Sequence, residues 1–297
     1  MRIYTLPNPT ALEKKSARLL SATAARNTEW RVFPNGENFL RVKQVSSRVG
    51  VLGRSHPPAD NFLRTLLLVD TLRRNGAREI IVWLPYFGYS RQDRALNPGE
   101  AVAAASLTAA LKAAGATQIV TLDLHSPLVS KESRIPIKTV SFMPELAAAL
   151  RRDLAGFAYT IVSPDRGGRE RAELFAKTLR HRGGICWIEK ERSARRVRAR
   201  KLHGQPQGMT AVLVDDILDT GGTVKEAVRL LRQRGFRQFF LAVTHPVFSA
   251  GAAKTVRSLK FKKILASNSL PLDPVTRRAC RVTVLDAAGL LARAVKK

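Results

Sequence analysis

Acidic, glycine and hydroxyl residues gather in one short stretch of the second half of the chain. The stretch AVLVDDILDTGGTVKEAVRLL, residues 211–231, starts with an apolar run typical of a buried strand and continues into a helical pattern. Between the two lie Asp215, Asp216, Asp219, Thr220, Gly221, Gly222 and Thr223. In open parallel sheets ligands bind beyond the carboxyl ends of strands. A helix that starts after glycines also offers free N–H groups to a phosphate.

The carboxylates of this stretch need a partner other than phosphate, which they would repel. Their natural partners are the vicinal hydroxyls of a sugar or a magnesium ion. Phosphate at one end and a diol at the other describe a pentose 5-phosphate. The GKS or GKT of a Walker-type loop is absent, so the stretch is not a nucleotide loop of that kind. A solvated acidic corner without function is the weaker alternative, because three Asp, two Gly and two Thr fall within nine residues.

The elements that must position these residues follow an alternating pattern of strands and helices. The first half gives strands at 49–55, 78–86 and 117–126, with helices over Asn61–Arg74 and Glu100–Ala114. The second half repeats this order, with helices over Arg169–Arg182 and Thr223–Arg234. The alternation predicts an α/β fold of two similar units, each a mainly parallel sheet flanked by helices. We expect domains at 1–143 and 144–297, with the last helix able to pack back on the first domain.

The net charge indicates which ligands the protein attracts, and the cysteine content indicates its redox compartment. The chain has 51 Lys and Arg against 23 Asp and Glu, a formal net charge of +28. Such a field attracts polyanions such as nucleotides, sugar phosphates and nucleic acid. The two cysteines, Cys186 and Cys280, form no CxxC pair, which suits a reducing compartment. No secretory signal or membrane span is recognisable. We therefore expect a cytoplasmic protein without a membrane partner.

The basic segment KERSARRVRARKLHG, Lys190–Gly204, shows no apolar periodicity and is expected to be a mobile surface loop. On its own it also fits a solvated or nucleic-acid-binding charge run. Because the remaining charge is spread over the chain and no reading helix or aromatic platform is evident, nucleic-acid contact is expected to be incidental.

The 211–231 stretch resembles the phosphoribosyl-diphosphate motif shared by type I phosphoribosyltransferases and ribose-phosphate diphosphokinases. Other segments resemble the diphosphokinases alone. They are FPNGENF with Phe33, Asn35, Gly36 and Glu37, YSRQDR with Arg91, Gln92 and Arg94, DLH with His125, SPDRGG with Asp165, and KER with Lys190 and Arg192. Asn35 departs from the family's usual aspartate. The length and the NPGEAV segment look most like the archaeal-type enzymes.

The resemblance implies two phosphoribosyltransferase-like domains and the reaction of ATP with ribose 5-phosphate to give 5-phosphoribosyl 1-diphosphate and AMP. It assigns ATP to the Phe33–Glu37 and Arg91–Arg94 segments, ribose 5-phosphate to Asp215–Thr223, and Mg²⁺ to His125 and Asp165. Lys190 and Arg192 become the catalytic pair on a flexible loop, and a homo-oligomer, at least a dimer, is expected. The alternatives are a type I phosphoribosyltransferase and a non-catalytic regulatory or nucleic-acid-binding relative.

Overall fold

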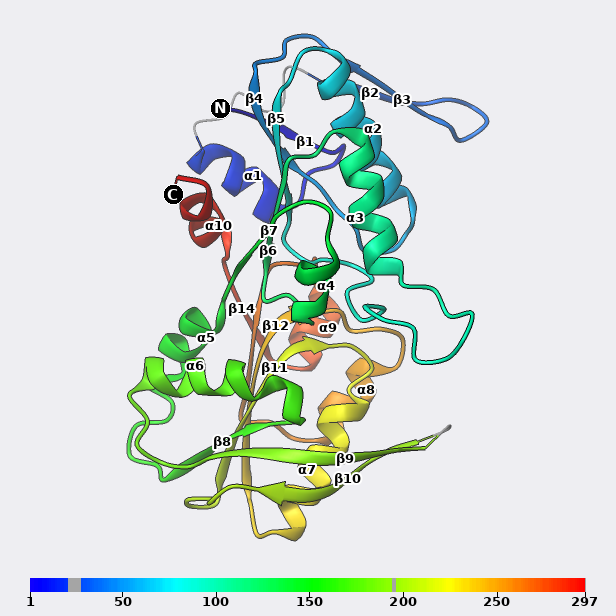
Figure 1. The fold of residues 1–297 in the computed structure, drawn as a ribbon. Coiled ribbons are helices and arrows are strands. Elements are labelled where there is room, and N and C mark those ends of the chain that lie inside the picture. Colours follow the sequence, from blue (N-terminus) through cyan, green and yellow to red (C-terminus); the bar gives the residue numbers. More distant parts are fainter. Residues whose placement is uncertain (21–27, 194–195, 297) are drawn as a thin grey trace. The chain divides into compact units, whose positions relative to one another are not determined.

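The chain forms two compact units in a computed structural model that describes residues 1–20, 28–193 and 196–296. The first unit comprises Met1–Val140 and Ala287–Lys297, and the second Ser141–Asp286 (Figure 1). The last helix therefore belongs to the first unit, whereas the expected division counted it with 144–297 and allowed it to pack back on the first domain. Among the described residues, no helix is both long and apolar enough to cross a membrane.

The first unit is a five-stranded parallel sheet of order β1-β4-β5-β6-β7 with helices on both faces. Figure 1 shows α2 and α3 on one face and α1 and α10 on the other. The strands are β1 (Arg2–Thr5), β4 (Arg48–Leu52), β5 (Glu79–Leu84), β6 (Gln118–Leu122) and β7 (Ile137–Val140). The helices are α1 (Ala11–Leu19), α2 (Asp60–Arg74), α3 (Ala103–Ala114), α4 (Pro127–Glu132) and α10 (Ala288–Lys296).

A separate two-stranded antiparallel hairpin extends from the first unit (Figure 1). It consists of β2 (Thr28–Val32) and β3 (Asn38–Val42), and residues 33–37 form its turn. Beside the turn of the hairpin, Arg64 of α2 donates from Nε to Asn38 Oδ1 at 2.8 Å. The sequence patterns did not predict this hairpin.

The second unit is a seven-stranded sheet of order β10-β9-β8-β11-β12-β13-β14. Its strands are β8 (Tyr159–Ser163), β9 (Ile185–Ser193), β10 (Arg196–His203), β11 (Thr210–Leu218), β12 (Gln238–Pro246), β13 (Lys263–Ser267) and β14 (Val282–Leu285). Its helices are α5 (Met143–Leu150), α6 (Arg169–Leu179), α7 (Gly222–Gln233), α8 (Ala252–Ser258) and α9 (Pro274–Ala279), with a 3-10 turn η2 at Arg166–Gly168. All strand pairs except β9–β10 are parallel.

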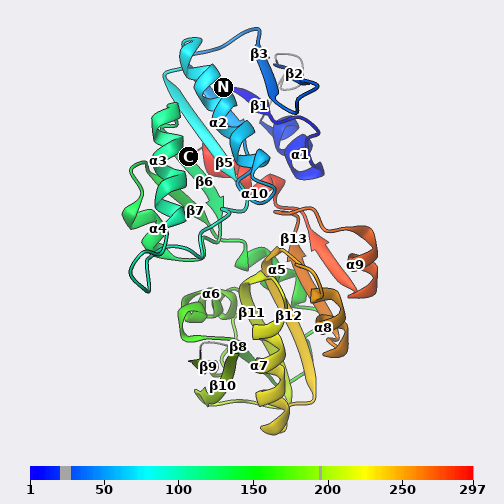
Figure 2. The same ribbon diagram turned by 90° about the vertical axis from the view of Figure 1, so that its right-hand side faces the viewer.

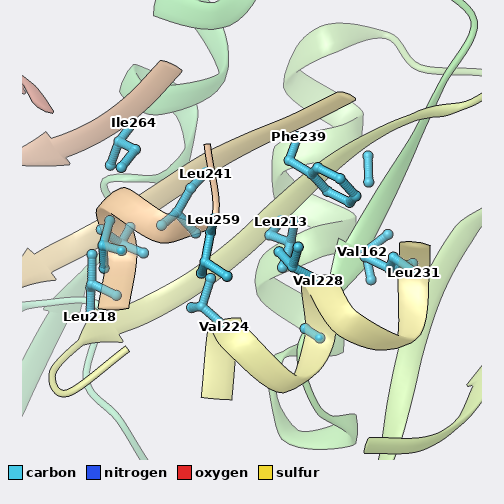
Figure 3. Close-up of a cluster of buried hydrophobic side chains, with 14 of the residues drawn as sticks. Val162, Leu213, Leu218, Val224, Val228, Leu231, Phe239, Leu241, Leu259 and Ile264 are labelled. Atoms are coloured by element: carbon cyan, nitrogen blue, oxygen red, sulfur yellow. The ribbon is translucent and has the colours of Figure 1, made fainter. Parts of the chain in front are cut away.

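One hydrophobic cluster of the second unit lies between its sheet and helix α7 (Figure 3). Leu213 and Leu241 of neighbouring strands pack against Val224, Val228 and Leu231, which recur at helical spacing on α7. All five side chains are at most 1 % exposed. This packing fixes the start of α7 directly behind the end of β11, where the acidic residues lie.

The prediction of a mobile loop over Lys190–Gly204 is wrong. This segment forms most of the antiparallel β9–β10 hairpin at the edge of the sheet. Its ladder is built from backbone hydrogen bonds, so it needs no apolar side-chain period, and charged residues are common on edge strands. Trp187 and His203 stack across the base of the hairpin with ring centroids 4.0 Å apart.

Helix α3 also starts later than predicted. The pattern placed its beginning at Glu100, but the helix begins at Ala103. The Glu100 carboxylate instead accepts hydrogen bonds from the backbone N–H of Leu96, at 2.8 Å, and from the side chain of Asn97. Glu100 therefore closes the NPGE turn rather than opening the helix.

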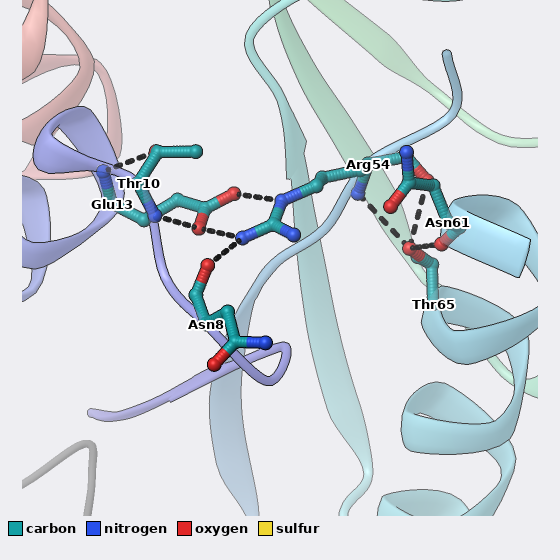
Figure 4. Close-up of polar contacts among 6 residues, drawn as sticks. All are labelled: Asn8, Thr10, Glu13, Arg54, Asn61 and Thr65. Carbon is teal, nitrogen blue, oxygen red and sulfur yellow. Dashed lines mark hydrogen bonds and ion pairs between the residues drawn. The ribbon is translucent and has the colours of Figure 1, made fainter. Parts of the chain in front are cut away.

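A buried ion pair joins α1 to the end of β4 (Figure 4). The guanidinium of Arg54 donates from Nε to Glu13 Oε1 at 2.7 Å and from Nη2 to Glu13 Oε2. Glu13 also closes the capping box of α1, because its Oε2 accepts the backbone N–H of Thr10 at 2.8 Å. The two side chains of the pair are only 13 % and 3 % exposed. The pair therefore anchors α1 against the sheet.

We expect Arg54→Met to destabilise the protein by about 3–5 kcal/mol, because it leaves the Glu13 carboxylate buried without its cation. The urea midpoint of unfolding measures this loss. Arg48→Met is the matched control, since the Arg48–Glu79 pair is 55 % and 47 % exposed and its removal should cost less than about 1 kcal/mol. Equal shifts in the two variants would contradict a special role for the Arg54–Glu13 pair.

Candidate functional site

Two adjacent carboxylates lie near the carboxyl end of strand β11 and share one arginine. Asp215 and Asp216 are 7 % and 2 % exposed. Arg171, in the first turns of α6, donates from Nη2 to Asp216 Oδ1 at 3.0 Å, and the same nitrogen lies 3.8 Å from Asp215 Oδ1. The backbone N–H of Asp216 donates to Asp215 Oδ1 at 2.9 Å. The acids predicted at this strand end are therefore present as one buried cluster with a cation.

The pKa of Asp215 lies well above its ordinary value. Burial is the largest cause, and the neighbouring charge of Asp216 raises the pKa further, with a smaller contribution from Asp165. Arg171 acts in the opposite direction. Burial and the charge of Asp216 destabilise the ionised Asp215 carboxylate. A ligand that brings positive charge or hydroxyl donors to this carboxylate therefore stabilises it.

Asp165 and Lys190 form a second ion pair in this unit. Lys190 Nζ, on β9, donates to Asp165 Oδ2 at 3.0 Å, and the backbone N–H of Gly168 donates to Asp165 Oδ1 at 3.0 Å. Burial alone would raise the pKa of Asp165, but Lys190, Gly168 and Arg171 together hold it below its usual value. Asp165 is thus a carboxylate, and its side chain remains 36 % exposed.

Residues 219–223 connect this acidic cluster to helix α7. Gly221 adopts φ +79° just before the helix, and a Cβ there would lie 3.2 Å from the Thr255 side chain. The backbone N–H of Gly222 donates to Thr220 Oγ1 at 3.3 Å. Asp219 accepts a hydrogen bond from the Ser249 hydroxyl. The predicted loop therefore exists as a tight turn in which backbone N–H groups begin α7, the geometry that suits a phosphate.

Arg171 is the residue of this cluster that sequence reasoning missed. It lies six residues after Asp165 in SPDRGGRERA, among other arginines that are exposed. The sequence did contain one indication of such a residue. Two carboxylates buried on one strand destabilise the fold unless a cation pairs with them, so a nearby Arg or Lys was to be expected. The helical register then places Arg171, rather than the exposed Arg169 with its partner Glu173, toward the sheet.

In the first unit, two predicted segments meet at the carboxyl ends of neighbouring strands. Arg91, Gln92 and Arg94 follow β5 and are exposed, and His125 follows β6 and is partly buried. Asp93 joins the segments, because its carboxylate accepts a hydrogen bond from the Ser126 side chain and pairs with Arg94 at 3.2 Å. The structure thus brings the arginine segment and the histidine segment together.

The turn of the β2–β3 hairpin carries the third predicted segment of this unit. Phe33 is 43 % exposed and packs edge-on against Phe39 with ring centroids 5.9 Å apart. Asn35 Oδ1 accepts the backbone N–H of Glu37 at 3.1 Å, and Gly36 adopts φ +91°. Figures 1 and 2 show this turn projecting from the unit, apart from the loop that follows β5. Within one chain, the turn at residues 33–37 and the loop that follows β5 are therefore separate segments.

Arg192 lies on β9, and its side chain is outside the described residues. His125 and Asp165, the predicted metal ligands, belong to different units. Within the described ranges, no three His, Cys, Asp or Glu side chains gather as a metal site. This donor set fits magnesium that arrives with phosphates, since Mg²⁺ is usually held by one or two carboxylates and by its substrate's phosphate oxygens. It does not fit a resident all-protein cage.

Comparison with known proteins covers both units. The family model of the N-terminal domain of ribose phosphate pyrophosphokinase matches residues 1–115, and that of the phosphoribosyl transferase domain matches residues 143–273. The predicted two-domain α/β fold is thereby confirmed.

Curated relatives match over most of the chain. A ribose-phosphate pyrophosphokinase of Synechocystis is 33 % identical over 99 % of this chain and 89 % of its own length. One of Methanopyrus kandleri is 35 % identical over 88 % of this chain and 89 % of its own length. The crystal structure of a phosphoribosylpyrophosphate synthetase from Mycobacterium smegmatis superimposes with a TM-score of 0.87 at 29 % identity, covering 99 % of this chain and 97 % of that one. Identities of similar size in different organisms do not favour the archaeal subtype. The chain belongs to the ribose-phosphate pyrophosphokinase family.

Proposed function

We propose that the protein transfers the β,γ-diphosphoryl group of ATP to the C1 hydroxyl of ribose 5-phosphate, releasing AMP. The observation that carries this proposal is the buried Asp215–Asp216 pair near the carboxyl end of β11, in the strand that leads into the turn before α7. Carboxylates beside free helical N–H groups suit a sugar that carries hydroxyls at one end and phosphate at the other. The matches of both units to the family models of ribose phosphate pyrophosphokinase and phosphoribosyl transferase domains support the ATP-dependent reaction.

Ribose 5-phosphate would bind at this strand end. Its ring hydroxyls would donate to Asp215 and Asp216, whose oxygens Arg171 already orients. Its phosphate would accept N–H groups from the turn, together with the hydroxyls of Thr220 and Thr223. The positive φ of Gly221 lets the backbone make this turn with its N–H groups at the start of the helix.

ATP would bind to the loops of the first unit. Arg91 and Arg94 would contact its phosphates, because guanidinium groups recognise phosphate oxygens in pairs. Phe33 would stack on the adenine, with Asn35 and Glu37 reading its edge. Since one chain holds the hairpin turn apart from the Arg91 segment, the same nucleotide can contact both only if a second copy supplies the hairpin. We therefore propose a homo-oligomer, at least a dimer.

Magnesium would reach the site with ATP and would be held by Asp165, with His125 contributing through water. When bound, it neutralises charge on the phosphate oxygens during transfer. Lys190 holds Asp165 in the absence of substrates and would release it to contact the moving diphosphoryl group, where Arg192 would assist. Positioning and charge neutralisation are the main requirements of this chemistry.

We also place the protein in the cytoplasm. Both thiols, Cys186 and Cys280, are free and buried, and burial raises the pKa of each. Neither therefore takes part in a disulfide, as suits a reducing compartment.

A coupled assay with ribose 5-phosphate, ATP and Mg²⁺ tests the function. AMP and phosphoribosyl diphosphate should form in equal amounts without any nucleobase. A type I phosphoribosyltransferase would instead consume phosphoribosyl diphosphate together with a base, and it would release no AMP. Binding of both substrates without turnover would favour the regulatory alternative.

Asn35→Asp should lower the KM for ATP up to about tenfold with little change in kcat, because a charged acceptor forms a stronger hydrogen bond with the adenine amino group. The hairpin should persist, since an Asp oxygen can accept the Glu37 N–H in the same way. Initial rates with ATP and GTP measure the effect, and GTP should gain nothing. An equal gain for both nucleotides would contradict recognition of the base by residue 35.

A further inference from the structure

A concentration of exposed cations lies on the second unit, away from the site described above. Residues 252–281 contain eight basic residues and one acidic residue, Asp273. Lys263 pairs with Asp153 at 2.7 Å. The other seven are exposed and form no ion pair within the described part of the chain, and five of them line one groove. These five are Lys254, Arg257, Lys260, Lys262 and Arg281.

The five cations line one groove beside helices α8 and α9, which are neighbours in Figure 2. The groove consists of two adjoining hollows of about 580 Å³ and 520 Å³, which share Arg257 and Ala279. Lys254 lines the first hollow, and Lys260, Lys262 and Arg281 line the second. Lys254, Arg257 and Lys260 recur at intervals of three residues, so they follow one side of α8 and its end. We call these five side chains and the space between them the α8–α9 groove.

Two of the groove cations adopt a left-handed backbone conformation that glycine adopts with less strain. Lys260 and Arg281 follow α8 and α9 and adopt φ +55° and +54°. Helices usually place glycine in this left-handed conformation at their ends, because other side chains are strained there. Strain that persists in a folded chain marks positions where the side chain itself is useful. Both strained residues carry a positive charge into the same hollow.

We propose that the α8–α9 groove binds the phosphate backbone of single-stranded RNA without reading its sequence. Cations that lack acidic partners match a chain of phosphates, which bind mainly through release of counterions. A second copy of this face would meet it with the same sign of charge, which opposes self-association through the groove. The concave shape, lined from two helices, suits a strand better than the flat surface of a lipid bilayer.

Most of the groove is distinct from the substrate site in position. Lys260 and Lys262 precede β13, and Arg281 precedes β14, so they lie at the amino ends of these strands. Asp215 and Asp216 lie near the carboxyl end of β11, in the same run of parallel strands. Lys260, Lys262 and Arg281 therefore lie at the opposite edge of the sheet from the acidic pair, whereas the Lys254 end of the groove lies beside Thr255, which packs near Gly221.

A triple variant, Arg257→Gln with Lys260→Gly and Arg281→Gly, tests the proposal on the full chain. The probe is a fluorescein-labelled 20-nucleotide RNA, followed by anisotropy from 50 to 200 mM salt. Loss of three phosphate contacts should weaken binding about 100-fold near 0.1 M salt and reduce the slope of log K against log[salt] by about 2. The thermal midpoint should stay the same or rise, because glycine relieves the strain at both helix ends. Diphosphokinase turnover should not change.

The matched control removes three exposed cations from the first unit: Lys43→Gln, Arg78→Gln and Lys112→Gln. It carries the same net charge as the groove variant, so it should retain near wild-type RNA affinity. Equal losses in the two variants would show that net charge alone binds RNA and would overturn the groove. Unchanged RNA affinity in the groove variant would overturn it as well. So would preferential binding of the wild-type groove to anionic phosphatidylserine vesicles in competition with the RNA.

Discussion

Lys190→Ala should lower kcat about 10³-fold while the KM values for ATP and ribose 5-phosphate change less than about threefold. The Lys190 ammonium group stabilises the negative charge that develops on the transferred oxygens. Its removal should therefore raise the free energy of the transition state more than it weakens substrate binding. In the structure Lys190 Nζ lies 3.0 Å from Asp165 Oδ2 and is only 10 % exposed at its side chain. It is therefore held beside a carboxylate that we propose as a magnesium ligand.

The control for this prediction lies on the other strand of the same hairpin. Lys201 is exposed on β10, so Lys201→Ala removes an equal charge without removing a contact to Asp165. Its kcat should stay within about twofold of wild type. Lys190→Arg should recover part of the rate, because a cation remains within reach. Turnover of Lys190→Ala close to wild type would exclude Lys190 from the mechanism, whatever the state of the fold.

Loss of folding does not explain the expected rate defect. Asp165 keeps 36 % of its side chain exposed and retains the N–H of Gly168, so removal of Lys190 should cost less than about 1 kcal/mol of stability. A thermal midpoint within a few degrees of wild type would accompany the loss of kcat. The pKa of Asp165 should rise, because Lys190 is the main group that lowers it.

The sequence predicted those parts of the fold whose pattern arises from burial. The apolar run of β11 and the helical spacing of α7 give a strand, a turn and a helix, and the structure confirms this order. The β2–β3 hairpin and strand β10 escaped prediction because their few apolar residues are mixed with charged ones. Ala199 of β10 is nevertheless buried in the core, and a register shift between Ala199 and Lys201 interrupts the period of the strand. The strands of both hairpins pair through the backbone, and their charged residues read like those of a loop.

The residues of the candidate site also divide into those that the sequence pattern predicts and those that it does not. Asp165 and the Asp215–Asp216 pair were recognised because acids at strand ends are conspicuous in sequence. Arg171 was not, because RGGRER contains three arginines and only the helical register shows which one points to the sheet. The separation of the Phe33 turn from Arg91 depends on how the β2–β3 hairpin leaves its unit, which no local pattern encodes.

Arg171→Met should destabilise the protein by about 3–5 kcal/mol at pH 8, because it leaves two adjacent carboxylates buried without their cation. Arg171 Nη2 lies 3.0 Å from Asp216 and 3.8 Å from Asp215, and the Arg171 side chain is 17 % exposed. Arg169→Met is the matched control on the same helix. Its pair with Glu173 is 61 % and 45 % exposed, so the loss should be below about 1 kcal/mol.

The pH dependence of this loss identifies its origin. The pKa of Asp215 is raised in the folded state, so the folded protein binds more protons than the unfolded chain there. The stability linked to Asp215 is complete below its unfolded pKa of about 3.9 and is lost as pH rises through the folded pKa. Arg171 lowers the folded pKa, so its removal raises the pKa further and enlarges the loss toward high pH.

As pH increases from 5, the urea midpoints of wild type and Arg171→Met should therefore diverge once the pH passes the folded pKa of Asp215 in the wild type. Arg171 also lowers the pKa of Asp165, but a lowered pKa costs stability only as pH falls toward it, so Asp165 adds a nearly constant offset in this range. A difference that stays constant even above the pH at which the wild-type stability stops falling would assign the loss to packing of the arginine stem instead. A widening difference assigns it to the repulsion between Asp215 and Asp216, the same charge that a bound sugar and its magnesium would relieve.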